Sequence, residues 1–160
     1  MEVRKEDLKA ATVFYDICEM LDKNAWKYTK NVEELRIEFS AQGEDLPIEL
    51  VTRVDADRQL VKVFSHLPYV ISEKKRIEVA IAVSVINNTM VDGCVDFDLS
   101  TGHLFFRITN SYRDSDISQA AYEYLVYCAC QTIDSFNDKL LMLSKGVISV
   151  EQFIELYGAE

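Results

Sequence analysis

A chain of 160 residues that is 49% hydrophobic and 28% charged is long enough to bury a core and too apolar to be disordered. We therefore expect one domain over 1–160, with its core in about 5–143 and a short terminal helix or tail at 147–160. The net charge of −10 disfavours nucleic acid and anionic membrane surfaces as partners. No apolar stretch reaches the length of a membrane span and the residues from Met1 to Asp7 carry no secretory signal, so a cytoplasmic location is expected.

The first part of the chain predicts a helix followed by a meander of three strands. Over 5–22, apolar residues recur at steps of three and four, which is typical of an amphipathic helix. Trp26 and Tyr28 open an extended region, and from Glu34 the apolar period changes to two. Strands are predicted at about 34–40, 48–54 and 59–65. The loops between them are short, so the strands pair antiparallel, and the last carries apolar residues on both faces.

Two patterns compete in the segment from Ser72 to Asn88. Over 77–86, β-branched residues alternate with others, which favours a strand, and this pattern alone does not distinguish strand from helix. However, Ser72 is placed as an N-cap, Asn87 and Asn88 suit a left-handed helix end, and the segment is longer than an ordinary strand. We therefore predict a buried helix.

A β-hairpin is the next predicted element, with strands over 90–99 and 103–109. Gly102 supplies the positive φ that a tight turn needs. The oxygen-rich stretch that begins at Asp96 invites a calcium interpretation, but a calcium loop needs Gly at its sixth position and Glu at its twelfth. Here Gly stands seventh and Arg107 twelfth. We predict a turn and no metal.

A long helix closes the predicted fold. Ser115 or Asp116 caps it, it runs over 117–143, and Gly146 ends it. The order is helix, three strands, helix, two strands and long helix, with no alternation of parallel strands and helices. The fold class is therefore α+β.

The sequence offers few candidates for chemistry. The cysteines lack the spacing of a zinc knuckle or a redox motif: Cys18, Cys94, Cys128 and Cys130. In the predicted hairpin Cys94 pairs near Arg107, too far from His103 for a catalytic dyad. We predict no catalytic residue, no metal, no cofactor and no enzyme activity. His66 is left open by the sequence, so a small thiol-dependent hydrolase using Cys94 or His66 stays the minor alternative.

One stretch carries a family resemblance. Ile86-Asn87-Asn88 and residues 93–107, GCVDFDLSTGHLFFR, together with the element order, resemble the YbjN family of bacterial sensory transduction regulators over about 26–143. The positions that match family landmarks are structural ones: Asn87 or Asn88, Gly93, Asp98, Gly102 and Arg107. Val95 stands where the family often has an aromatic residue. The resemblance implies the fold of type III secretion chaperones and a dimerising, noncatalytic domain.

We therefore expect a chaperone-like or regulatory protein-binding domain that acts as a homodimer. Its expected partners are itself and an unidentified protein client, which dock on the sheet and the long helix. Tyr122, Tyr124 and Tyr127 occupy more than one face of that helix, so some of them are expected in an interface or exposed. The candidate interface residues are Tyr124, Tyr127 and Phe136, with packing inside the chain as the alternative. A ligand-sensing regulatory domain is the second functional hypothesis.

Overall fold

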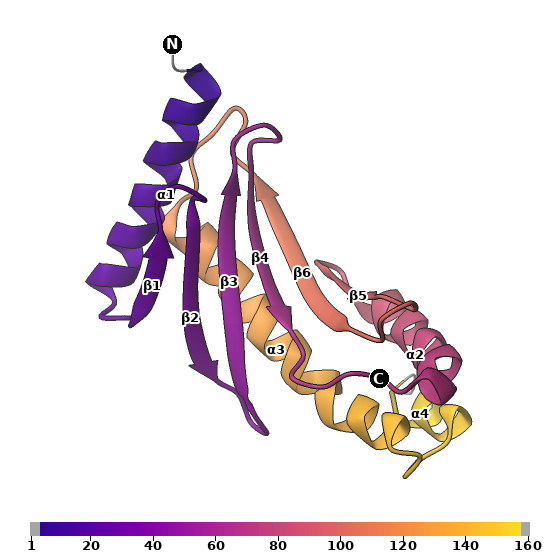
Figure 1. The fold of residues 1–160 in the computed structure, drawn as a ribbon. Coiled ribbons are helices and arrows are strands. Elements are labelled where there is room, and N and C mark those ends of the chain that lie inside the picture. Colours follow the sequence, from indigo (N-terminus) through magenta and orange to yellow (C-terminus); the bar gives the residue numbers. More distant parts are fainter. Residues whose placement is uncertain (1–3, 158–160) are drawn as a thin grey trace.

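The computed structural model describes residues 4–157 and contains one antiparallel sheet with helices on one face and at one end (Figure 1). The strands lie in the order β1-β2-β3-β4-β6-β5. Their bounds are Tyr28–Asn31 (β1), Arg36–Gln42 (β2), Pro47–Asp55 (β3), Leu60–His66 (β4), Cys94–Phe97 (β5) and Leu104–Ser111 (β6). The predicted α+β class is confirmed.

The meander has four strands, not the three predicted. The extended region that Tyr28 opens is strand β1, and Tyr28 pairs with Phe39 of β2. Its four residues show no alternation, since only Tyr28 is half-buried. A strand of this length without an apolar face gives no period-two signal, which is why the sequence pattern missed it.

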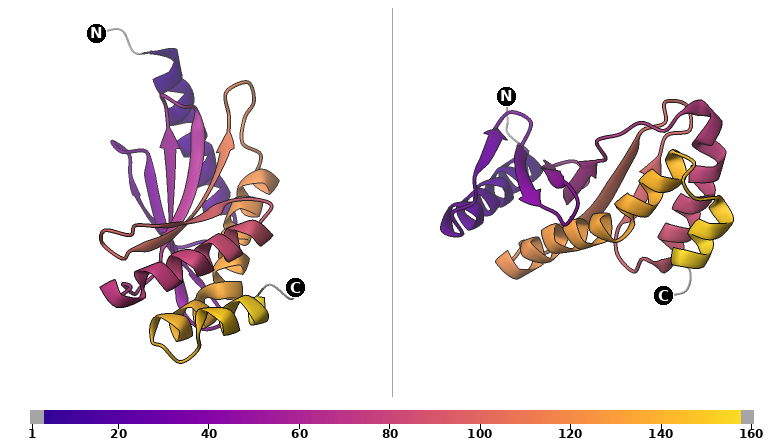
Figure 2. Two further views of the ribbon diagram at one scale, coloured as in Figure 1. Left: turned by 90° about the vertical axis from the view of Figure 1, so that its right-hand side faces the viewer. Right: turned by 90° about the horizontal axis from the view of Figure 1, so that it is seen from below.

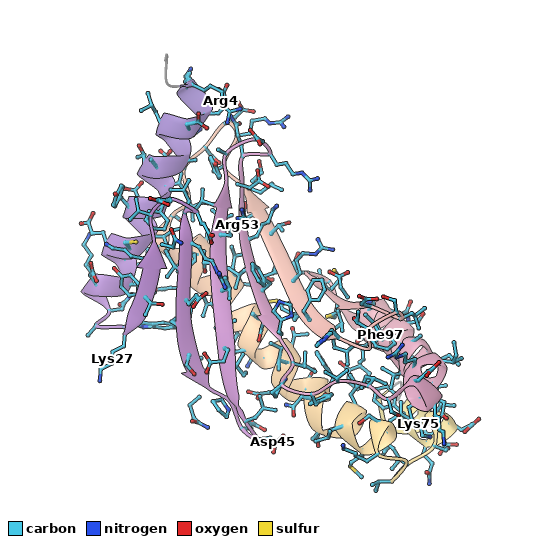
Figure 3. All side chains as sticks on the ribbon, viewed as in Figure 1. Arg4, Lys27, Asp45, Arg53, Lys75 and Phe97 are labelled. Carbon is cyan, nitrogen blue, oxygen red and sulfur yellow. The ribbon has the colours of Figure 1, made fainter. Side chains whose placement is uncertain are left out.

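Helices α1 (Lys5–Lys23) and α3 (Gln119–Ser144) lie on the same face of the sheet, as Figure 2 shows from below. The strand side chains on that face are buried: Ile37, Phe39, Ile48, Leu50, Thr52, Val54, Val61, Val63, Leu104, Phe106 and Ile108. No helix formed by residues 4–157 covers the opposite face. Figure 3 is viewed onto this open face, from which Arg53 of β3 projects. The sheet is therefore covered on one side only.

The predicted helix in the middle of the chain is confirmed as α2 (Arg76–Thr89), which follows a 3₁₀ turn at Glu73–Lys75. Ser72 stands at the N-cap position of this turn, as predicted, but its side chain makes no cap bond. The predicted left-handed helix end is wrong, because the left-handed residues do not include Asn87 or Asn88. The helix is also only partly buried, because it covers the β5 end of the structure and leaves one side outward (Figure 2).

The hairpin forms as predicted around Gly102, whose φ is +82°, but β5 is shorter than expected. The chain leaves α2 at Thr89 and must reverse before it can pair with β6. Residues 90–93 make that reversal, with Gly93 at a φ of +80°. The strand therefore begins at Cys94 and not at residue 90.

The cap of the long helix is Ser118, not Ser115 or Asp116. The Ser118 hydroxyl accepts a hydrogen bond from the backbone N–H of Ala121 at 3.1 Å. The helix ends before Gly146, which has a φ of +73°, as predicted.

The terminal segment forms helix α4 (Val150–Tyr157), which packs on α2 and α3. Phe153 and Tyr157 are its buried residues. The last residues of the predicted 147–160 segment, 158–160, lie outside the described part of the chain, as do 1–3.

Candidate interaction surfaces

The three candidate interface residues of α3 fall in different environments. Tyr124 is 49% exposed and Tyr127 is 59% exposed, whereas Phe136 is 0% exposed in the core. Nine residues separate Tyr127 from Phe136, which places them about 180° apart around a helix. An interface role is therefore wrong for Phe136, because α3 turns this side chain into the core beneath the sheet.

Tyr127 stands at a cavity of about 300 Å³ between the end of α1, the residues before β1 and the first turns of α3. Its lining is mostly apolar and includes Met20, Trp26 and Val126. Tyr122 forms part of the wall, and its hydroxyl is already bound to Thr52 at 2.8 Å. The cavity therefore has a fixed apolar wall and an aromatic entrance.

Tyr124 lies on another side of α3 and joins it to the loop after α2. Its hydroxyl donates a short hydrogen bond to the carboxylate of Asp92. This acceptor raises the pKa of Tyr124, because loss of the phenolic proton would break the bond and place two negative charges together. Tyr124 is thus exposed but tied to a neighbour, whereas Tyr127 makes no such bond in the described residues.

The landmark Asn87 closes the outer edge of β5. Its side-chain amide donates to the carbonyl of Val95 at 3.0 Å, and its Oδ1 accepts from the N–H of Val95 at 2.8 Å. Both outward backbone groups of Val95 are therefore occupied. This edge cannot accept another strand at that residue.

The remaining landmarks fix the hairpin. Asp98 accepts hydrogen bonds from the side chains and backbone of Ser100 and Thr101, which holds the pKa of Asp98 well below its usual value. At Gly102 a Cβ would lie 2.3 Å from the carbonyl oxygen of Ile71, so only glycine fits. Asp98 and Gly102 therefore have a structural role, which is to hold the conformation of this turn.

Cys94 and the two histidines are not brought together. Cys94 pairs with Arg107 of β6, whereas His66 lies on β4 and pairs with Phe105. That offset of two strands and two residues separates Cys94 from His66 by roughly 12 Å. Burial, together with the Asp96 carboxylate, raises the pKa of the Cys94 thiol. The Arg107 guanidinium contacts the Cys94 Sγ at 3.2 Å, but burial and the Asp96 carboxylate outweigh it, so the thiol form is favoured over the reactive thiolate.

The open face of the sheet carries a row of cations across three strands. Arg36, Arg53 and Lys62 are register neighbours. Arg36 pairs with Glu38, and Lys62 pairs with Asp55 at 2.5 Å. Arg53 has no ion-pair partner among residues 4–157. The row is thus largely neutralised by its own acids.

Helix α2 presents an apolar stripe that sequence reasoning missed. Ile77 is 69% exposed and Ile81, one turn later, is 43% exposed. Leu99 is also half exposed, on the turn that Arg76 ties to α2 through the carbonyls of Leu99 and Ser100. We call Ile77, Ile81 and Leu99 the α2 patch. Val79, Ala82, Val83 and Ile86 are buried on the inner side.

Within residues 4–157, no three or more His, Cys, Asp or Glu side chains gather as metal ligands would. No helix in the same residues has the length and apolarity that a bilayer crossing requires.

No family model and no curated protein matches the sequence. The structure, however, is similar to the crystal structure of YbjN from E. coli, which is described as a proposed transcription regulator. The TM-score is 0.55 at 10% sequence identity, and the match covers 75% of this chain and 84% of YbjN. At this identity the likeness concerns the fold. The chain therefore has a YbjN-like fold, as its hairpin and element order predicted.

Proposed function

We propose that this chain is a noncatalytic protein-binding domain that acts as a homodimer through the α2 patch. The observation that carries the proposal is the outer side of α2. This helix lies at one end of the structure beside α4 (Figure 2), and two isoleucines one turn apart are exposed on it. Exposed aliphatic side chains gathered on one helix mark an interaction surface.

A second copy of the same chain fits this surface by symmetry and by charge. A twofold contact sets the same patch against itself. If two α2 helices pack antiparallel, the basic start of each, where Lys74 is exposed, faces the carbonyl end of the other. The carbonyl end of a helix attracts cations, and Asp92 follows it in the chain. Such a contact offsets part of the repulsion between two chains of charge −10.

Sedimentation equilibrium tests the homodimer. We expect the wild-type chain to have twice the monomer mass, and the double variant Ile77→Asp, Ile81→Asp to have the monomer mass. Leu8→Asp is the control, because Leu8 is comparably exposed on α1 at the far side of the structure (Figure 1). A monomeric wild type, or a dimer that survives both aspartates, would rule the proposal out. Circular dichroism of each variant verifies folding.

A protein client is the second part of the proposal, with Tyr124 and Tyr127 as its contacts. Both tyrosines are exposed on α3, and tyrosine is enriched in interfaces because it joins a large apolar area to a polar tip. In affinity capture from the source lysate, Tyr127→Ala or Tyr124→Ala should lose a client that the wild type retains. Tyr15→Ala, on α1 and similarly exposed, should retain it. Equal capture by all variants would exclude this face.

A further inference from the structure

The cavity beside Tyr127 combines aromatic rings with an acid. Trp26 stands at its edge, and its ring is held edge-on against Phe39 at 5.2 Å between centroids. Glu123 also lines the cavity, one turn before Tyr127 on α3. Apart from the uncharged amide of Asn24, the rest of the wall is mostly apolar. Cys130 belongs to it, and burial raises the pKa of its thiol to about 11 and keeps it neutral. The carboxylate is thus the one ionised group in the lining.

The Glu123 carboxylate is held in place without being neutralised. Its Oε1 accepts hydrogen bonds from Asn24 at 3.2 Å and from Gln119 at 2.8 Å. Both donors are uncharged amides. Among residues 4–157, no Lys, Arg or His forms an ion pair with Glu123, and its Oε2 accepts no hydrogen bond from them. The acid is therefore held at the exposed rim of the cavity by Asn24 of the opposite wall and by Gln119 of its own helix, without a cationic partner.

We propose that this cavity binds a small organic cation, an ammonium carried on an aromatic or short aliphatic body. The apolar wall would bury the body, the aromatic rings of Trp26 and Tyr127 in the lining would attract the cation, and Oε2 of Glu123 would accept a hydrogen bond from the ammonium. The size fits, because about 300 Å³ is at the lower end of small-molecule pockets. The net charge of −10 adds a field that draws cations and repels anions. This inference does not depend on the homodimer, since the α2 patch lies elsewhere.

Three compounds with one aromatic ring and different charge test the proposal: 2-phenylethylammonium, 2-phenylethanol and phenylacetate. Trp26 is the chain's one tryptophan, so its fluorescence reports directly on the cavity. We expect the ammonium to bind roughly tenfold more tightly than the alcohol, the gain of about one charge-assisted hydrogen bond, and phenylacetate to bind most weakly. Equal affinity for all three, or binding of none, would overturn the proposal.

Variants test whether Glu123 causes the preference for the ammonium compound over the alcohol. In Glu123→Gln the ammonium and the alcohol should bind within about twofold of each other, because the variant side chain keeps its size and loses its charge. Glu33→Gln is the matched control, since Glu33 is an exposed glutamate outside the cavity, and it should keep the tenfold preference. Tyr127→Ala should weaken all three compounds. An ammonium preference that survives in Glu123→Gln would contradict the assignment.

Discussion

At the scale of single residues, Asn87 has more effect on the fold than its half-exposed position suggests. In Asn87→Ala, the two hydrogen bonds to Val95 are lost and the β5 edge is opened. We expect the free energy of unfolding to fall by about 1–2 kcal/mol in urea titrations. Asn88→Ala is the control and should stay within about 0.5 kcal/mol of wild type, because Asn88 is exposed and makes no side-chain bond in the described residues. Equal losses in both variants would contradict the role given to Asn87.

The Asp55–Lys62 pair makes a pH-dependent contribution. The hydrogen bond from Lys62, more than any other contact, lowers the pKa of Asp55 below its ordinary value of 3.8. A carboxylate with a lowered folded pKa stabilises the fold above the unfolded pKa, and this contribution is lost as pH falls through the folded value. Asp55→Asn should therefore cost about 1 kcal/mol at pH 7 and little in strong acid. Asp45→Asn, at an exposed loop residue, is the control and should leave the free energy of unfolding at pH 7 within about 0.5 kcal/mol of wild type.

At the scale of elements, Ser118 caps α3 and Ser115 does not, although the sequence alone does not distinguish the two serines. Ser118→Ala removes the bond to the Ala121 N–H and should lower the free energy of unfolding by about 1 kcal/mol. Ser115→Ala should change it by less than about 0.5 kcal/mol, since Ser115 is exposed in the preceding turn. Thermal and urea unfolding measure both. A larger loss for Ser115→Ala would mean that the helix begins earlier than the structure has it.

The elements that the sequence predicted well are those with long periodic patterns or with a turn residue of known geometry. The helix expected at 5–22, which is α1, and the Gly102 turn are of this kind. The prediction failed where the pattern was short, as in β1, and at the start of α3, where Ile117 packs into the core one residue before the true cap. Helix α2 was predicted correctly because its length outweighed its β-branched alternation, although the left-handed end expected at Asn87 or Asn88 did not form.

The candidate surfaces were predicted less well, for a geometric reason. Helical spacing alone places Phe136 opposite Tyr127, so its burial was within reach of the sequence. The outward side of α2 was not, because isoleucine and valine occur around the whole helix and only packing decides which of them face outward. The cavity beside Tyr127 needs the end of α1, the residues before β1 and the first turns of α3 together, and no local pattern in the sequence brings Trp26 near Tyr127.

At the scale of the whole molecule, self-association through α2 must change the thermal stability of the protein as well as its molecular mass in solution. If two chains unfold from one dimer, the unfolding midpoint rises with protein concentration, by roughly 2 °C per tenfold increase for chains of this length. Scanning calorimetry over a hundredfold range should show this rise for the wild type and for Leu8→Asp. The midpoint of Ile77→Asp, Ile81→Asp should not depend on concentration. A concentration-independent wild type would mean that the α2 patch is left open in a monomer, and it would contradict the homodimer without affecting the cation cavity beside Tyr127.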